Sequence, residues 1–195
     1  IGMGHTRWAT HGAPSDRNSH PHTSNNGRLS IIHNGIIENY ATLKEELLRR
    51  GHAFNSDTDT EVLIHLIEEV YKNEHTDLLE AVRLALNKVT GAYAIVVMDQ
   101  DNPNELIAAR KGSPMVIGVG KGEYFIASDA TPIIEYTKNV IYLNDNEIAY
   151  LKRDELLIKR LDNVVQTPYI QELELQLEML EKGGYDHFML KEIYE

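Results

Sequence analysis

A change in hydrophobic period near residue 90 limits the folds open to this chain more than any other feature. Between residues 40 and 89 apolar residues recur at helical spacing, whereas Ala92 to Met98 form a continuous apolar run that ends in a turn signal at 100–104. A run of this kind is typical of a strand that is buried on both faces. The sequence therefore predicts an α+β fold, with helices early, strands late and helices covering the sheets.

The same patterns place the individual elements. We expect helices over 40–50, 60–71, 78–89 and 170–182, and a further helix from Phe188. We expect strands over 29–33, 92–98, 106–110, 115–119, 124–128, 140–143, 148–151 and 156–160. A short helix is expected at Thr131–Pro132, capped by Asp129 or Thr131. Two sheets packed face to face inside helical layers would bury these strands.

The simplest division of the chain is one domain over 1–169 and a C-terminal helical segment over 170–195. Residues 10–27 are rich in Gly, Pro, Ser, Asn and His, which predicts a long ordered loop, and loops of this length are usually functional. The opening residues IGMGH resemble the interior of a buried strand, so we expect the front strands of the domain to be missing.

Charge and composition exclude several classes of function. The 19 Lys and Arg against 30 Asp and Glu give a net charge of −11 without a basic cluster, so no nucleic-acid partner is expected. No apolar run approaches the roughly 20 residues that span a bilayer, and no secretory signal is present, so we expect a cytoplasmic protein with no membrane partner. The absence of Cys removes disulfides, thiolate metal sites and cysteine nucleophiles.

Arg7, Trp8, Thr10 and His11 bring four different polar or aromatic groups together at the start of the long loop. A guanidinium can clamp the carboxylate of a small zwitterion, a hydroxyl can add a hydrogen bond, and an indole can act as a lid. The same residues are also compatible with a capped loop in which Trp8 is half-buried and Arg7 pairs with an acidic residue.

Asn34 and Gly35 follow an apolar strand and allow two interpretations. They are a strong signal for a type I′ hairpin turn, but the residues after them lead toward a helix. A side-chain amide beside a glycine N–H could instead form a two-donor oxyanion hole. Asp59 is similarly open: it could cap the helix that follows, or it could receive a substrate ammonium.

No metal and no cofactor are expected. His11, His20, His22 and His33 suggest zinc, but their spacing matches no ligand motif and Pro21 restricts the backbone between two of them. A calcium site at Asp57 and Asp59 lacks the glycine and terminal glutamate of a calcium loop. The glycines at positions 112, 118, 120 and 122 are typical of turns, and no phosphate-binding loop is present.

Taken together, these motifs resemble the class II, N-terminal-nucleophile glutamine amidotransferases. The resemblance spans the whole chain and is carried by HTRWATHG (5–12), HPH (20–22), HNGIIENY (33–40), SDTDTEV (56–62), GAYA (91–94), ASDATP (127–132) and HFMLKEIYE (187–195). RWATHG, HPH and KEIYE are similar to the sugar aminotransferases within this family. Amidophosphoribosyltransferases and asparagine synthetases share only the looser themes.

The resemblance implies a four-layer αββα sandwich that hydrolyses L-glutamine to glutamate. The ammonia would pass to a separate sugar-isomerase domain and convert fructose 6-phosphate into glucosamine 6-phosphate, without a cofactor. Arg7 would bind the glutamine α-carboxylate, aided by Thr10 and His11, while Asp59 would bind the α-ammonium. The Asn34 side chain and the Gly35 N–H would form the oxyanion hole. Trp8 would close over the substrate and gate the passage of ammonia.

One departure from the family is chemical. The family nucleophile is a Cys at the mature N-terminus, and this chain contains none, so we expect the chain to be inactive as a glutaminase. Loss of strands would expose sheet edges, so we also expect a homodimer or a higher oligomer. The alternatives are the glutaminase part of another class II enzyme, such as an amidophosphoribosyltransferase, and a non-catalytic interaction module of the same fold.

Overall fold

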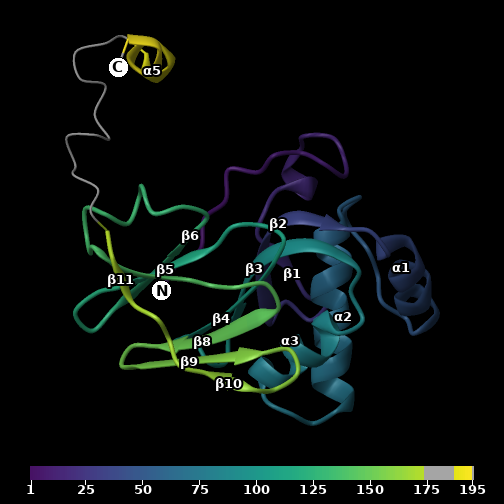
Figure 1. Cartoon of the computed structure of the whole chain (residues 1–195). Coiled ribbons are helices and arrows are strands. Elements are labelled where there is room, and N and C mark those ends of the chain that lie inside the picture. The colour runs from purple at the N-terminus through teal and green to yellow at the C-terminus, as the bar shows by residue number, and fades with distance from the viewer. Residues whose placement is uncertain (174–186, 195) are drawn as a thin grey trace. The chain divides into compact units, whose positions relative to one another are not determined.

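The computed structural model describes residues 1–173 and 187–194 (Figure 1). The chain divides into two compact units. The first unit comprises Ile1–Pro114 and Leu143–Pro168, and the second comprises Met115–Tyr142 and the residues from Tyr169 onward. In the part of the chain that the structure describes, no helix is long and apolar enough to cross a membrane.

The first unit is built on a seven-stranded antiparallel sheet with the order β1-β2-β3-β4-β8-β9-β10. Consecutive strands are neighbours except where β8 joins β4. The strands are β1 (His22–Thr23), β2 (Leu29–Ile37), β3 (Gly91–Asp99), β4 (Glu105–Lys111), β8 (Glu147–Lys152), β9 (Glu155–Arg160) and β10 (Val165–Gln166). The long β2–β3 pair, from Leu29↔Asp99 to Ile37↔Gly91, forms the part of the sheet that carries the site described below.

Three helices of the first unit gather on one side of this sheet (Figure 1): α1 (Tyr40–Arg49), α2 (Asp59–Asn73) and α3 (Leu78–Leu86). The central helix α2 is buried along most of its length, and one core joins it to both other helices and to alternate residues of the strands. In β3 these alternate residues are Tyr93, Ile95 and Val97. Ala94 and Val96 point the other way and are buried as well, which confirms the prediction that this strand is covered on both faces.

The second unit contains a four-stranded sheet with the order β11-β7-β5-β6. Its strands are β5 (Val116–Val119), β6 (Tyr124–Ala127), β7 (Asn139–Tyr142) and β11 (Gln171–Glu172), and the unit ends with α5 (Phe188–Tyr194). Val116, Ile133 and Val140 form a small core of its own.

The mixture of helices and antiparallel sheets confirms the predicted α+β class. The helices between residues 40 and 89 and most strands after residue 90 lie within a few residues of their expected bounds. One strand was predicted too short: β2 does not stop at His33 but continues to Ile37. The loop over 10–27 contains two elements that the sequence did not predict, a 3₁₀ turn at Asp16–Asn18 and β1.

Two expected helices differ. At Thr131–Pro132 the chain makes a series of turns, and Asp129 Oδ1 accepts the Thr131 N–H at 2.7 Å. The helix predicted over 170–182 is wrong at its start, because Gln171–Glu172 pair with β7, and its remainder lies outside the described residues. A separate segment over 170–195 stays a prediction.

Arg28 and Asp99 form a bidentate ion pair at the end of the β2–β3 ladder. Arg28 Nε and Nη2 donate to the two carboxylate oxygens at 2.7 and 2.6 Å, and Asp99 is fully buried. Burial alone would raise the pKa of Asp99, but the bonds from Arg28 and from the Asp101 N–H lower it.

We expect Asp99→Asn to lower the free energy of unfolding by about 2 kcal/mol, because it leaves the guanidinium without its buried charge partner. Removal of one member of a buried pair costs about 3–5 kcal/mol, and Arg28 is 31% exposed, which reduces the loss. The matched control is Asp101→Asn, because Asp101 also contacts Arg28 but is 64% exposed. It should cost less than about 0.5 kcal/mol in urea denaturation at pH 7. Equal losses in both variants would contradict this assignment.

Candidate active site

Asn34 and Gly35 lie inside β2 and not in a hairpin turn, so the turn interpretation is wrong. Gly35 has φ +130°, and a Cβ added there would lie 2.2 Å from the Ala92 carbonyl oxygen. Only glycine fits this conformation and this close approach of β3. The strand therefore continues past the amide pair and presents it at the surface of a cavity.

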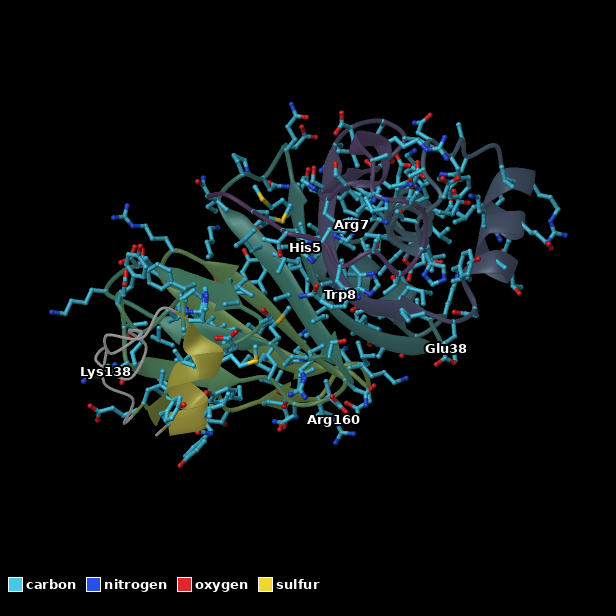
Figure 2. All side chains as sticks on the ribbon, turned by 90° about the horizontal axis from the view of Figure 1, so that it is seen from above. His5, Arg7, Trp8, Glu38, Lys138 and Arg160 are labelled. Carbon is cyan, nitrogen blue, oxygen red and sulfur yellow. The ribbon has the colours of Figure 1, made fainter. Side chains whose placement is uncertain are left out.

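The Asn34 side chain is held by His5, a residue whose role the sequence did not predict, although it belongs to the HTRWATHG motif. The Arg7 N–H donates to His5 Nδ1 at 2.9 Å, so the imidazole proton is on Nε2. His5 Nε2 donates it to Asn34 Oδ1 at 2.7 Å. Because the amide oxygen is occupied, the Asn34 NH₂ group remains available as a donor. Figure 2 shows His5, Arg7 and Trp8 along the N-terminal segment.

The first turn of α2 is capped by Thr58, whose side chain accepts the Glu61 N–H at 3.2 Å. Glu61 reaches back and accepts the N–H groups of Asn55 and Ser56, both at 2.7 Å. Burial would raise the pKa of Glu61, but bonds from His65, Asn55 and Ser56 outweigh it and lower the pKa to about 2. Asp59 is therefore not the N-cap, and its carboxylate is free for another role.

Asp59 is 3% exposed and lies between the end of β2 and the start of α2. Its Oδ2 accepts the Ile37 N–H at 2.8 Å, and its Oδ1 lies 3.8 Å from His11 Nδ1. The N-terminus of a helix favours a negative charge at this position. The Asp59 carboxylate supplies the anionic side of the site.

Arg7 supplies the cationic side and also closes its own loop. The guanidinium donates to the carbonyl oxygens of His11 at 2.6 Å, Gly12 at 3.0 Å and Ala13 at 3.4 Å. Three of its five donors are thus used and two remain. The capped-loop interpretation is correct for these carbonyls. The described residues include no acidic partner for Arg7, and the indole is not half-buried, because Trp8 is 90% exposed.

One cavity of about 200 Å³ in the first unit brings the predicted residues together. All seven of them contribute to its wall, together with five residues that the sequence did not assign to it. The lining residues are Arg7, Trp8, Thr10, His11, His20, His33, Asn34, Gly35, Ile36, Thr58, Asp59 and Thr60. Pockets for drug-sized ligands are larger, at roughly 300–1,000 Å³, so this cavity suits a small polar metabolite.

The histidines near the cavity contact hydroxyl groups and one another. His22 Nε2 and His33 Nδ1 bond to the hydroxyls of Thr58 and Thr60, each at 3.0 Å. The His20 ring lies 4.4 Å from that of His5 and 5.0 Å from that of His22. Burial, with smaller contributions from these neighbours, His33 and Arg7, lowers the pKa of His20 to about 3. Asp57 pairs with the exposed Arg17.

Comparison with known proteins agrees with this geometry. A glutamine amidotransferase domain model matches residues 5–135. The chain is 58% identical to a glutamine–fructose-6-phosphate aminotransferase (isomerizing) of Bacteroides thetaiotaomicron, and 56% identical to that of Chlorobaculum tepidum. Both matches cover the whole chain but only 32% of the relative, so the chain spans about a third of their length.

Solved structures give the same class. The glutamine phosphoribosylpyrophosphate amidotransferase of Bacillus subtilis aligns with a TM-score of 0.66 and 28% identity, over 80% of this chain and 34% of that chain. A second structure, described as the allosteric regulatory enzyme of purine biosynthesis, aligns with a TM-score of 0.62 and 29% identity over 74% of this chain and 31% of that one.

Fold and site together define a class II glutamine amidotransferase domain of the N-terminal-nucleophile type, and the chain belongs to this family. Within the family, its sequence is similar to the glutaminase part of the glutamine–fructose-6-phosphate aminotransferases.

The lowered pKa of His20 leads to a prediction about how the stability of the folded chain changes at acidic pH. The unfolded chain takes up this proton near pH 6.5, whereas the folded chain takes it up only near pH 3, so stability is lost as pH falls from 6.5 toward 3. We expect His20→Gln to remove about 2 kcal/mol of the stability difference between pH 7 and pH 5 in urea denaturation.

The control for this experiment is His75→Asn, which removes an exposed imidazole just after α2. Asn tolerates the positive φ of 46° at this position. This variant should keep the pH dependence of the parent chain. An unchanged pH dependence in His20→Gln would show that His20 titrates normally in the folded state.

Proposed function

We propose that this domain binds L-glutamine in the cavity and holds its side-chain amide for attack by a nucleophile. The observation that carries the proposal is the presence of three complementary groups in one cavity wall: Arg7 as cation, Asp59 as buried anion, and the Asn34–Gly35 pair as amide donors. An α-amino acid needs one cation and one anion placed apart. A tetrahedral intermediate needs two donors directed at its oxygen.

The two proposed oxyanion donors are the Asn34 NH₂ and the Gly35 N–H. The contact from His5 supports this role, because it occupies the amide oxygen and turns the nitrogen toward the cavity. We propose His5 as a positioning residue for Asn34. The lack of a Cβ at Gly35 lets a substrate carbonyl approach the backbone closely.

The remaining wall residues have supporting roles in this proposal. Two unused N–H donors of Arg7 would bind the α-carboxylate, with help from the Thr10 hydroxyl and from His11. Asp59 Oδ1 would bind the α-ammonium, since Oδ2 is already occupied by Ile37. Trp8 would move from its exposed position over the bound amino acid and control the passage of ammonia.

We further propose that the ammonia is used to convert fructose 6-phosphate into glucosamine 6-phosphate by a sugar-isomerase domain. The support is the 58% and 56% identity to relatives named for this reaction, of which the chain matches about a third. Residues 170–195 would lead toward that domain. A cytoplasmic location and self-association are further parts of this proposal.

An amidophosphoribosyltransferase is the second candidate, supported by the structural similarity to the Bacillus subtilis enzyme. Its 28% identity is about half that of the sugar aminotransferases, which favours the first candidate. A non-catalytic module of the same fold would bind glutamine but would not hydrolyse it.

Trp8 gives a direct assay for glutamine binding, because it is the only tryptophan in the chain and lines the cavity. We expect L-glutamine to shift the emission of Trp8 to shorter wavelength with saturable dose dependence. Asp59→Asn and Arg7→Gln should each weaken binding about 10- to 100-fold, since each removes a charge-assisted contact. D-glutamine should bind weakly, because its ammonium and carboxylate cannot reach both partners at once.

Matched controls separate these contacts from general effects of charge. Asp57→Asn removes an exposed carboxylate two residues from Asp59, and Arg49→Gln removes a surface guanidinium on α1. Both should bind glutamine normally. Glutaramic acid, which lacks the ammonium, should be insensitive to Asp59→Asn but sensitive to Arg7→Gln. If both variants affect glutamine and glutaramic acid equally, the assignment of the two ends is wrong.

Ammonia release provides a separate prediction. The 195-residue chain contains no Cys, so we expect no hydrolysis of L-glutamine above the buffer rate in an assay coupled to glutamate dehydrogenase. Turnover that is abolished by Asp59→Asn would mean that another residue of this chain serves as the nucleophile.

A further inference from the structure

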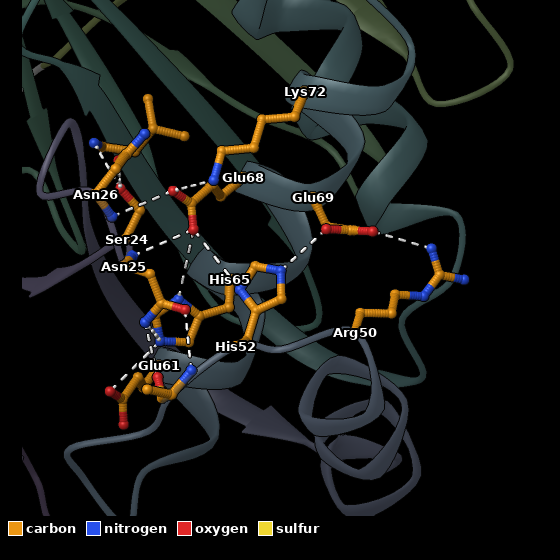
Figure 3. Close-up of polar contacts among 12 residues, drawn as sticks. Ser24, Asn25, Asn26, Arg50, His52, Glu61, His65, Glu68, Glu69 and Lys72 are labelled. Atoms are coloured by element: carbon orange, nitrogen blue, oxygen red, sulfur yellow. Dashed lines mark hydrogen bonds and ion pairs between the residues drawn. The ribbon is translucent and has the colours of Figure 1, made fainter.

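A second group of buried polar residues lies outside the cavity, where the turn at 24–26, the segment after α1 and helix α2 meet (Figure 3). His65 and Glu68 are three residues apart on α2 and therefore share one face of the helix. His52, which follows α1, approaches the same face. The exposed fractions are 8% for His52 and 1% each for His65 and Glu68. None of the three lines the glutamine cavity.

The outer nitrogen of each imidazole contacts a carboxylate. His52 Nε2 lies 3.0 Å from Glu69 Oε2, and His65 Nε2 lies 3.4 Å from Glu61 Oε1. An ionised carboxylate only accepts hydrogen bonds, so His52 Nε2 carries the proton and His52 Nδ1 holds a lone pair. His65 Nε2 also lies 3.3 Å from the Asn25 amide nitrogen, which donates one of its two hydrogens to the Ala53 carbonyl at 2.7 Å. In the tautomer with the His65 proton on Nε2 and directed at Glu61, His65 Nδ1 holds a lone pair as well.

Both Nδ1 atoms lie near the same oxygen atom, Glu68 Oε2. His52 Nδ1 and His65 Nδ1 lie 3.7 and 3.9 Å from Glu68 Oε2, and the three atoms lie within 4.8 Å of one another. These separations are too long for hydrogen bonds, and both Nδ1 atoms are buried without a hydrogen-bond partner among residues 1–173 and 187–194. A buried acceptor without a partner costs about 1–3 kcal/mol, so two of them at one point require a partner that satisfies both.

We propose that His52, His65 and Glu68 form a binding site for one divalent transition-metal ion of the zinc type. Zinc binds imidazole nitrogen at about 2.0–2.1 Å, which places tetrahedral ligands about 3.4 Å apart. The two nitrogen–oxygen separations of 3.7 and 3.9 Å would contract by a few tenths of an ångström, and the nitrogen–nitrogen separation, which is within 4.8 Å, would contract further. A water molecule fills the fourth position. Glu69 fixes the tautomer of His52, and Glu61 accepts the Nε2 proton of His65 in the tautomer that binds the ion, as carboxylates do for histidines that bind zinc.

The surroundings of Glu68 are compatible with this ion. Lys72 Nζ and the Asn26 N–H contact Oε1 at 2.9 and 3.3 Å, whereas Oε2 accepts the Asn25 N–H at 3.2 Å and lies near the two histidines. One carboxylate oxygen is thus bound to the protein and the other is directed at the site. Lys72 is 50% exposed and Glu69 19% exposed, so the site lies close to the surface.

The ion would link the segment after α1 to helix α2 and so stabilise the folded chain. Metal binding to the native state raises the free energy of unfolding, because the unfolded chain does not hold the three ligands together. The site is separate from glutamine binding, so its test does not depend on the proposed function. A buried water in place of the metal is the competing explanation.

The test uses the 195-residue chain, treated with a chelator and then dialysed against zinc. We expect one zinc per chain by elemental analysis and a higher melting temperature with zinc. With cobalt(II), we expect the intense visible bands of a four-coordinate ion. Glu68→Gln and His52→Gln should each weaken zinc affinity at least about 100-fold in competition with a chromophoric chelator. Circular dichroism verifies that both variants are folded.

The controls are His75→Asn and His20→Gln, which remove imidazoles outside the group. Both should bind zinc as the parent chain does. The proposal is overturned if the parent chain binds less than about a tenth of an equivalent, the result expected for a water-filled site. It is also overturned if His20→Gln abolishes binding, or if folded Glu68→Gln and His52→Gln both bind normally.

Discussion

The hydrogen bond from the Ile37 N–H to Asp59 Oδ2 joins the end of strand β2 to the first turn of helix α2, at a point closed to water. The amide pair Asn34–Gly35 lies just before this bond on the strand, so the bond brings a buried anion and two amide donors to the same cavity. It can form only because Thr58 caps the helix and leaves Asp59 free. The position of the Asp59 carboxylate in the cavity therefore depends on Thr58, which caps the helix in its place.

Hydrophobic period predicted most helices and strands, because burial of apolar faces decides where these elements form. It could not predict that β2 passes through Asn34–Gly35. A glycine with positive φ fits a tight turn and also fits a close contact between two strands. Only the position of Ala92 on β3 shows that Gly35 belongs to the second case. The contact of His5 with Asn34 spans 29 residues, so no local pattern reveals it. The seven predicted site residues do share one cavity, and they were chosen for the charges and donors that a zwitterion would need.

The histidines illustrate the same limit in another way. His20 and His22 form a conspicuous pair in the sequence, yet His22 Nε2 bonds to the Thr58 hydroxyl and the His20 ring lies against that of His22. His52 and His65 attract no attention in the sequence, but carboxylates contact their outer nitrogens, and their inner nitrogens lie 3.7 and 3.9 Å from Glu68 Oε2. Whether a group of histidines can bind a metal ion depends on where their unprotonated nitrogens lie. The tautomers and the packing of the side chains decide this, and the spacing along the chain does not reveal it.

The guanidinium of Arg7 has one more consequence, which concerns kinetics. Its bonds to the carbonyl oxygens of His11, Gly12 and Ala13 hold the guanidinium against the loop and leave two of its N–H donors for an incoming carboxylate. In the proposed function the guanidinium would bind this carboxylate without first releasing the loop, so the association rate constant would lie in the usual range for a preformed pocket. The three carbonyl oxygens restrict the rotation of the side chain before the ligand arrives, which lowers the entropy that binding has to remove.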